Sequence, residues 1–112
     1  MHPRPSLPEI SPQELKQKLD ENESVFLLDV REQSEYDIVH IEGARLVPLN
    51  TLPHHLDSLP SDREIVVYCH HGQRSLYATA YLHQNGFTDA KNLAGGIDQW
   101  AVQIDPTLHR YG

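Results

Sequence analysis

The sequence predicts a single α/β domain in which helices cover both faces of a parallel sheet. Two runs of consecutive apolar residues, at 25–30 and 65–68, are typical of strands that are buried on both sides. Segments with helical composition lie between and after these runs, so strands and helices alternate along the chain. A chain of 112 residues is long enough for one small hydrophobic core, and we expect one domain over residues 9–112.

A leader and a helix are expected at the start of the chain. Residues 1–8 include three prolines and predict a flexible leader. Ser11 follows, and its hydroxyl can cap a helix in which Pro12 takes the first position. Glu14 completes a capping box, because its carboxylate can accept a hydrogen bond from the backbone N–H of Ser11. The sequence therefore predicts a helix that begins directly after Ser11.

The next segment is expected to contain the first buried strand and two short helices. Residues 25–30 are apolar except for Asp29, which lies near the carboxyl end of the predicted strand. Ser34 is expected to cap the first short helix, and Asn50 or Thr51 the second. The connection between the two helices is expected to be extended.

The second half of the chain repeats the alternation of strand and helix. Residues 65–68 have the composition of a strand, with three β-branched residues and one aromatic residue. A helix is expected over residues 75–85, followed by a short strand at 91–93 and a helix that contains Trp100 as a core residue. The helix at 75–85 is expected to pack through its large apolar residues and one alanine, namely Leu76, Tyr77, Ala80, Tyr81 and Leu82.

The charge of the chain excludes several classes of partner. The 9 Lys and Arg residues and the 16 Asp and Glu residues give a net charge of −7 with neutral histidines. A chain with this charge is repelled by phosphate groups and anionic lipid, so we expect no nucleic acid and no membrane as partners. No apolar run approaches the ~20 residues of a membrane span, and residues 1–8 lack the apolar segment of a signal peptide. We therefore expect a cytoplasmic protein.

The chemistry of the chain is expected at its only cysteine, Cys69, which lies between the strand at 65–68 and the helix that follows. The amino-terminal end of that helix presents unpaired N–H groups and the positive end of its dipole. Gly72 allows the loop to turn its own N–H groups inward, and Arg74 adds a permanent positive charge. These groups stabilise an anionic sulfur, so we expect Cys69 to be a nucleophilic thiolate that solvent can reach. The loop consists of His70, His71, Gly72, Gln73, Arg74 and Ser75.

The length of this loop distinguishes two chemistries. Only four residues, His70 to Gln73, separate Cys69 from Arg74. A loop with one more residue at this place suits a tetrahedral phosphate, as in cysteine-dependent phosphatases, whereas a tighter ring of N–H donors fits one terminal sulfur atom. The loop length therefore favours a persulfide over a phosphate.

Four segments of the chain together resemble the rhodanese-like sulfurtransferases. Residues 69–75 have the Cys-x-x-Gly-x-Arg-Ser pattern of that family's active-site loop. Residues 28–32 are similar to its first signature strand, and residues 40–44 to its Gly-His-Ile-Pro-Gly-Ala segment, with Glu42 in place of the proline. Residues 92–96 resemble its carboxyl-terminal motif. The segments occur in the order in which the family has them.

The resemblance implies the fold, the reaction and the partners of this chain. The fold is a rhodanese-like, three-layer α/β arrangement with a parallel sheet of about five strands between helices. The reaction is that of a thiosulfate/persulfide sulfurtransferase: Cys69 takes sulfane sulfur from a small anionic donor such as thiosulfate or polysulfide, or from a protein persulfide, and passes it to cyanide or a thiol. No cofactor and no metal are required. The tail from Ile104 to Tyr111 is similar to that of rhodanese domains associated with enzymes that activate sulfur-carrier proteins, which indicates a sulfur-relay protein as a further partner.

The residues around the loop are assigned supporting roles. Asp29 and Arg31 follow a strand that is expected beside the loop, and Asp29 is expected to orient other groups rather than to act as an acid or a base. Arg74 either organises the loop, by bonding its carbonyl groups and the Asp29 carboxylate, or contacts substrate, and we favour the first role. His70 and His71 either line the mouth of the loop, with positive charge when protonated, or only fill it. Adjacent histidines lack the spacing of metal ligands, so no metal site is expected.

Two other functions use the same features. A non-catalytic protein-interaction module could retain the rhodanese scaffold, although the intact cysteine loop argues against it. A redox or arsenate-handling enzyme could use the same thiol, but it normally needs a second, resolving cysteine, which this chain lacks. External thiols could replace that cysteine, so this third function stays open.

Overall fold

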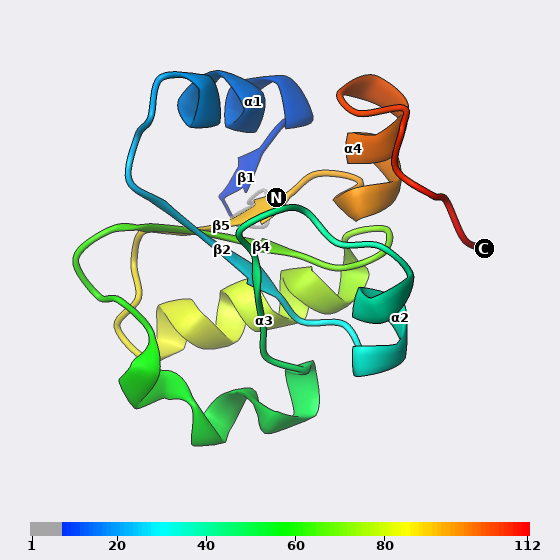
Figure 1. Ribbon diagram of the computed structural model, residues 1–112. Coiled ribbons are helices and arrows are strands. Elements are labelled where there is room, and N and C mark those ends of the chain that lie inside the picture. Colours follow the sequence, from blue (N-terminus) through cyan, green and yellow to red (C-terminus); the bar gives the residue numbers. More distant parts are fainter. Residues whose placement is uncertain (1–7) are drawn as a thin grey trace, which may run out of the picture.

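The computed structural model describes residues 8–112, whose strands form one sheet of five parallel strands (Figure 1). The predicted α/β class and the expected number of strands are confirmed. The strands, in the spatial order β1-β5-β4-β2-β3, are β1 (Glu9–Ile10), β2 (Val25–Asp29), β3 (Arg45–Leu46), β4 (Glu64–Tyr68) and β5 (Ala90–Leu93). The helices are α1 (Pro12–Asp20), α2 (Gln33–Ile38), α3 (Gln73–Gln84) and α4 (Gly96–Gln103), with two 3-10 helices, η1 (Leu49–His54) and η2 (Leu56–Ser58).

The central strand β4 is buried because helices cover both faces of the sheet. All 5 residues of β4 are buried, as its apolar run predicts. Its side chains alternate between two apolar clusters: Ile65 and Val67 belong to one, and Val66 and Tyr68 to the other. The sheet therefore separates two cores.

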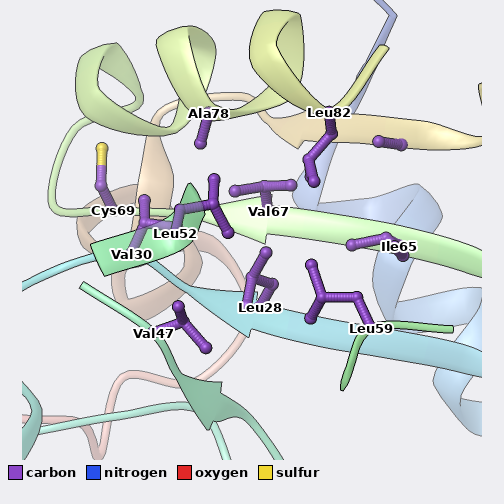
Figure 2. Close-up of a cluster of buried hydrophobic side chains, with 11 residues drawn as sticks. Leu28, Val30, Val47, Leu52, Leu59, Ile65, Val67, Cys69, Ala78 and Leu82 are labelled. Atoms are coloured by element: carbon purple, nitrogen blue, oxygen red, sulfur yellow. The ribbon is translucent and has the colours of Figure 1, made fainter. Parts of the chain in front are cut away.

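The two cores lie on opposite faces of the sheet and make the predicted three layers. One core includes Ala78 and Leu82 of α3 together with Leu52 of η1 (Figure 2). The other includes Leu15 of α1 and Trp100 of α4, so the expected core position of Trp100 is confirmed. Figure 1 shows α1 and α4 on one side of the sheet and α3 on the other.

The predicted cap of α1 is confirmed, whereas that of α2 is wrong. Ser11 Oγ accepts a hydrogen bond from Glu14 N at 3.0 Å, and Glu14 Oε1 accepts one from Ser11 N at 3.0 Å. Glu32, not Ser34, precedes α2, and its backbone N–H donates to Glu35 Oε1 at 3.1 Å. Ser34 already lies in the first turn of the helix, where its hydroxyl cannot take the capping position.

The prediction of a short helix capped by Asn50 or Thr51 is also wrong. The segment forms η1 and η2 instead, and Pro48 precedes η1. The Thr51 hydroxyl donates to the Pro48 carbonyl at 2.8 Å rather than capping a helix. Pro53 lies inside η1 and has no N–H for an α-helical hydrogen bond, which keeps this segment in tight 3-10 turns.

The predicted packing surface of α3 is right for Leu82, which is buried, and for Tyr81, which packs against the same core, but wrong for Leu76 and Tyr77. Tyr77 is 75% exposed and Leu76 is 40% exposed, and of the predicted set Leu82 is the residue that is fully buried. The buried residues of α3 recur at the spacing of one helix face: Ser75, Ala78, Thr79 and Leu82. Because residues three, four and seven positions apart share a face, Leu82 and three small side chains lie on the buried face of α3, whereas Leu76 and Tyr77 lie on the exposed one.

The start of the described chain adds a strand that the sequence does not indicate. The strand β1 has 2 residues and pairs with β5, and just before it the Pro8 carbonyl accepts a hydrogen bond from Asn92 N at 2.9 Å. The rest of the leader predicted over residues 1–8 lies outside the described residues. Within residues 8–112, no helix combines the length and the apolar character needed to cross a membrane.

Candidate active site

Cys69 lies at the carboxyl edge of the sheet, directly after β4, and its loop leads into α3. Gly72 precedes the helix with φ +106°, in the left-handed region that favours glycine. The helix begins at Gln73 and not at Ser75 as predicted, so its first turn forms part of the loop. Cys69 therefore faces the amino-terminal end of a helix from the end of a buried strand.

Three hydrogen-bond donors point at the Cys69 sulfur. The backbone nitrogens of Gly72 and Ser75 lie 3.1 and 3.4 Å from Sγ, and the Ser75 hydroxyl oxygen lies 3.3 Å from it. The N–H of Ser75 belongs to the first turn of α3, where backbone donors have no partner inside the helix. These donors and the helix dipole favour negative charge on the sulfur.

The expected exposure of Cys69 is wrong for this conformation, because the residue is only 1% exposed. Its side chain belongs to the same apolar cluster as Val30 and Val67. Figure 2 shows the sulfur at one end of this cluster, pointing away from Val30 and Val67. The sulfur is therefore shielded from solvent in this conformation, and a sulfur donor requires some opening of its surroundings to reach it.

Asn92, on β5, connects Ser75 to the backbone of the loop. Its Oδ1 accepts a hydrogen bond from Ser75 Oγ at 2.5 Å, and its Nδ2 donates to the Gly72 carbonyl at 3.2 Å. Ser75 has one hydroxyl proton, so it donates either to Asn92 or to the Cys69 sulfur at any one time. A thiol can donate to Ser75 while Ser75 donates to Asn92, whereas a thiolate requires the proton of Ser75 for itself. The arrangement of this network therefore depends on the ionisation of Cys69.

Arg74 pairs with Glu35 of α2, and the predicted bond between Arg74 and Asp29 is wrong. Arg74 NH1 and NH2 lie 2.6 and 2.8 Å from the two carboxylate oxygens of Glu35, in a bidentate pair. The hydrogen bonds from Arg74 lower the pKa of Glu35 to about 2, and Glu35 in turn raises the pKa of Arg74. Arg74 therefore ties the first turn of α3 to α2.

Asp29 instead forms a fully buried ion pair with Arg31. Arg31 Nε lies 2.9 Å from Asp29 Oδ1, and Arg31 NH2 lies 2.6 Å from Asp29 Oδ2. Arg31 also donates to the Val39 carbonyl at 2.7 Å and to the Tyr111 hydroxyl at 2.9 Å. Burial acts to lower the pKa of Arg31, but the hydrogen bonds with Asp29 and Tyr111 outweigh it and raise the pKa. Asp29 thus fixes the position of Arg31, which in turn contacts Tyr111.

The backbone of the loop rests on the start of α4. Ile97 N donates to the Cys69 carbonyl at 2.9 Å, and Asp98 N donates to the His70 carbonyl at 3.1 Å. Gly96 has φ +64°, and a Cβ at this position would lie 2.5 Å from the carbonyl oxygens of both Cys69 and His70. Gly96 is therefore required by the close approach of two backbones as well as by its own conformation.

Of the two histidines in the loop, His70 is partly buried and His71 is exposed. The His70 ring is stacked between those of His71 and Tyr111, with ring centroids 3.9 Å apart in each pair. His70 Nε2 is buried and has no hydrogen-bond partner among residues 8–112. Burial, followed by the charge of His71, lowers the pKa of His70, so the ring is neutral near pH 7.

The ring nitrogens of His70 and His71 and the carboxylate of Asp98 are close enough for a metal ion, all lying within 4.8 Å of one another. Their geometry does not suit one. The two rings are stacked with 25° between their planes, and lone pairs that lie in nearly parallel ring planes do not converge on a point. Asp98 already accepts hydrogen bonds from Arg110 at 2.9 and 3.0 Å. This cluster therefore lacks the geometry of a metal centre.

Comparison with known proteins identifies the family. Residues 11–103 match the family model described as "Rhodanese-like domain". The chain belongs to the rhodanese-like family. A relative from Allochromatium vinosum named "Sulfurtransferase" is 40% identical over 83% of this chain and 87% of its own length.

Larger proteins and solved structures are similar to this rhodanese-like domain as well. The Mycobacterium tuberculosis protein named "Probable adenylyltransferase/sulfurtransferase MoeZ" is 44% identical over 91% of this chain, which spans only 26% of that protein's length. The crystal structure of a rhodanese-like domain protein from Staphylococcus aureus has a TM-score of 0.80 and 34% identity, covering 94% of this chain and 99% of that one. The predicted family and fold are confirmed.

In the structure of this rhodanese-like domain, some of the predicted site residues contact the sulfur and others do not. Gly72 and Ser75 donate to it, whereas Gln73 and His71 are exposed. Arg74 reaches α2 instead of the sulfur. Four further residues meet the loop only through the fold, and no site role is assigned to them from the sequence, although residues 92–96 and the tail to Tyr111 are singled out by their resemblance to the family; these residues are Glu35, Asn92, Gly96 and Tyr111.

Proposed function

We propose that this chain is a sulfurtransferase that carries sulfane sulfur as a persulfide on Cys69. The observation that carries the proposal is the group of donors aimed at Cys69 Sγ, from the backbone of Gly72 and from the backbone and hydroxyl of Ser75. Family membership and the name of the Allochromatium vinosum relative support a role in sulfur transfer. The donors add a chemical reason, since they stabilise an anionic sulfur at this position.

In the first half of the reaction, the Cys69 thiolate attacks the outer sulfur of the donor. A bond forms between Sγ and that sulfur, the S–S bond of the donor breaks, and the rest of the donor leaves with the electron pair, as sulfite when the donor is thiosulfate. The N–H groups of Gly72 and Ser75 stabilise the thiolate before the attack. The outer sulfur then carries the negative charge beside the amino-terminal end of α3.

In the second half, cyanide or a thiolate attacks the outer sulfur. The bond between this sulfur and Sγ breaks, Cys69 leaves as a thiolate, and the acceptor becomes thiocyanate or a new persulfide. One sulfur atom moves from donor to acceptor, so the cycle needs no external oxidant or reductant.

The residues around the loop hold it in place for this reaction. Arg74 is anchored by Glu35, and Asp29 holds Arg31. His70, the first residue of the loop, is stacked on Tyr111. None of these groups has to gain or lose a proton, because sulfur transfer moves a nucleophile and a leaving group. The exposed residues of the loop, where we expect the donor to arrive, are His71 and Gln73.

The proposed partners are a small sulfur anion as donor, cyanide or a thiol as acceptor, and a sulfur-relay protein. The relay is supported by the protein named both adenylyltransferase and sulfurtransferase, of which this chain matches 26% of the length. A rhodanese-like domain joined to an adenylyltransferase is suited to deliver sulfur to an adenylated protein. We propose that this chain serves a partner of the same kind.

Thiocyanate formation tests the proposal. The protein is incubated with cyanide and with thiosulfate, polysulfide or a small-molecule persulfide in turn, and thiocyanate is measured. The wild-type protein should form thiocyanate with at least one donor, and Cys69→Ser should form none, because its hydroxyl cannot carry the sulfur. A wild-type protein that is inactive with every donor rules out the proposed transfer.

The burial of Cys69 favours one alternative, a non-catalytic protein-interaction module on the same scaffold. The two functions differ in how they depend on the sulfur atom. An interaction module should retain its cellular role in a Cys69→Ala variant, whereas a sulfurtransferase should lose it. A folded Cys69→Ala protein that complements a deletion strain would favour the module.

A further inference from the structure

The segment that follows α4 returns to the active-site loop. Arg110, in this segment, donates to the Asp98 carboxylate of α4 at 2.9 and 3.0 Å. Figure 1 shows the segment running from α4 toward the side of the molecule where α2 lies. This path brings Tyr111 against His70 and Glu35.

The hydroxyl of Tyr111 connects two charged groups near the loop. It accepts a hydrogen bond from Arg31 NH1 at 2.9 Å and donates one to Glu35 Oε2 at 2.7 Å. Arg31 is held by Asp29, and Glu35 holds Arg74. Tyr111 therefore joins a buried ion pair to a half-exposed one in a single hydrogen-bonded network.

The ring of Tyr111 contacts the loop directly. It is stacked on the His70 ring, with centroids 3.9 Å apart and 11° between the planes. His70 directly follows Cys69, and its buried Nε2 has no hydrogen bond within the described part of the chain. Stacking thus holds the His70 side chain in place. Tyr111 restrains the loop at two points, His70 directly and Arg74 through Glu35.

The protonation states keep this network in one arrangement at neutral pH. Burial raises the pKa of Tyr111 to about 12, although the hydrogen bond from Arg31 acts to lower it, so the hydroxyl keeps the proton that it donates. Arg74 lowers the pKa of Glu35 to about 2, so the carboxylate remains an acceptor. The bond from Tyr111 to Glu35 therefore keeps its direction.

We propose that Tyr111 is a positioning residue, which holds His70 and Arg74 in place and so keeps the N–H donors of the loop aimed at the Cys69 sulfur. This inference rests on the proposed sulfur transfer. Tyr111 contacts His70, which follows Cys69, and through Glu35 it restrains Arg74, which lies between the donor residues Gly72 and Ser75, so it acts on the alignment of the donors. It also keeps the loop closed over Cys69, which is buried in this conformation.

Tyr111→Phe is the most informative variant, because it keeps the ring on His70 and removes the hydroxyl bonds to Arg31 and Glu35. The matched control is Tyr77→Phe, since Tyr77 is 75% exposed on α3. Two rates are measured in the folded protein: persulfide formation from excess thiosulfate, followed by intact mass, and alkylation of reduced Cys69 by iodoacetamide.

Persulfide formation at saturating thiosulfate should slow about tenfold in Tyr111→Phe, because a buried hydrogen bond to charged groups is lost. The thiosulfate concentration that gives the half-maximal rate should not change, since the donor is expected to arrive at His71 and Gln73, which the substitution leaves unchanged. Alkylation should become several-fold faster, because a less restrained loop opens more often. Tyr111→Ala should change both rates further, and Tyr77→Phe should change neither.

A merely structural role of Tyr111 predicts a different result. The melting temperature of Tyr111→Phe would fall while both rates, measured well below it, stayed at wild-type values, and this outcome would overturn the proposal. Alkylation requires no sulfur donor, so it tests the positioning role of Tyr111 independently of the proposed sulfur transfer. A wild type that forms no persulfide disproves sulfur transfer, whereas the role of Tyr111 is still decided by whether Tyr111→Phe exposes Cys69 to iodoacetamide.

Discussion

Ser75 lies fully buried beside the Cys69 sulfur, and replacing it with alanine removes one of the three donors. The hydroxyl oxygen is 3.3 Å from Sγ and 2.5 Å from Asn92 Oδ1. The backbone N–H of residue 75 remains in Ser75→Ala, as does that of Gly72. The variant therefore isolates the contribution of the hydroxyl group to sulfur transfer.

The expected magnitude follows from the geometry of these two bonds. Removing a preorganised donor from a developing anion costs roughly 10²–10³ in rate when the bond is short and unshared. The bond from Ser75 to sulfur is longer and its proton is shared with Asn92, so we expect about a tenfold slower formation of the persulfide, or ~1.4 kcal/mol. Asn92 Oδ1 also loses its buried partner, which lowers the free energy of unfolding by about 1–3 kcal/mol.

The assay measures the two effects separately. The rate of persulfide formation is followed by intact mass after mixing with thiosulfate, and the free energy of unfolding is measured in urea. Ser34→Ala is the matched control, because Ser34 is exposed on α2 and the same hydroxyl group is lost. A folded Ser75→Ala protein that forms the persulfide at the wild-type rate would show that the hydroxyl does not stabilise the sulfur.

Two further variants test the surroundings of the loop. Gly96→Ala should lower the free energy of unfolding by at least about 2 kcal/mol, because its Cβ would lie 2.5 Å from the carbonyl oxygens of Cys69 and His70. Gly43→Ala, which has a positive φ but nothing within 4 Å of its Cβ, should lose only about 1 kcal/mol, and equal losses in urea would contradict the steric reason. Glu35→Gln should flatten the acid side of the stability profile. The folded pKa of Glu35, about 2, lies below the ordinary value of 4.5, so the carboxylate contributes stability that is present above pH 4.5 and lost as the pH falls toward 2. Melting temperatures of the wild type and Glu35→Gln should therefore converge as the pH falls through this range, and a constant difference would contradict the assignment.

Most of the fold could be predicted from local sequence patterns, which involve residues close together in the chain. The strand at 65–68 is recognisable because its residues are apolar on both faces, and helices cover both faces in the structure. The start of α1 is recognisable because Ser11 and Glu14 satisfy one another's backbone N–H groups. The strand β1 has only 2 residues and pairs with β5 far along the chain, so it leaves no such pattern.

Contacts between distant parts of the chain explain why the predicted side-chain partners around the site were wrong. Arg74 has the charge needed to pair with Asp29. In the folded chain, however, Arg74 lies beside Glu35 and pairs with it, whereas Asp29 pairs with Arg31. Tyr111 and Glu35 are 76 positions apart in the sequence, and nothing local to either residue indicates their hydrogen bond. Composition thus predicts which chemical groups the loop contains, whereas their pairing depends on how the helices pack.

The burial of Cys69 was not predicted for the same reason, since it too arises from contacts between distant parts of the chain. The sequence indicates a tight loop of N–H donors, and the structure contains two of these donors and a hydroxyl at the sulfur. The loop also contacts α4 and Tyr111, and these contacts between distant segments could not be predicted from the sequence. Sulfur transfer on Cys69 therefore requires a loop that both stabilises the anion and opens to admit the donor.

Intact-mass spectrometry of the native protein tests most directly whether this loop supports a sulfur anion on Cys69. After treatment with thiosulfate or polysulfide, the mass should rise by one sulfur atom, about 32 Da, and return to the starting value when cyanide is added. Cys69→Ser should show no change under the same conditions. A wild-type mass that stays constant with every donor, or an equal gain in Cys69→Ser, would contradict the account.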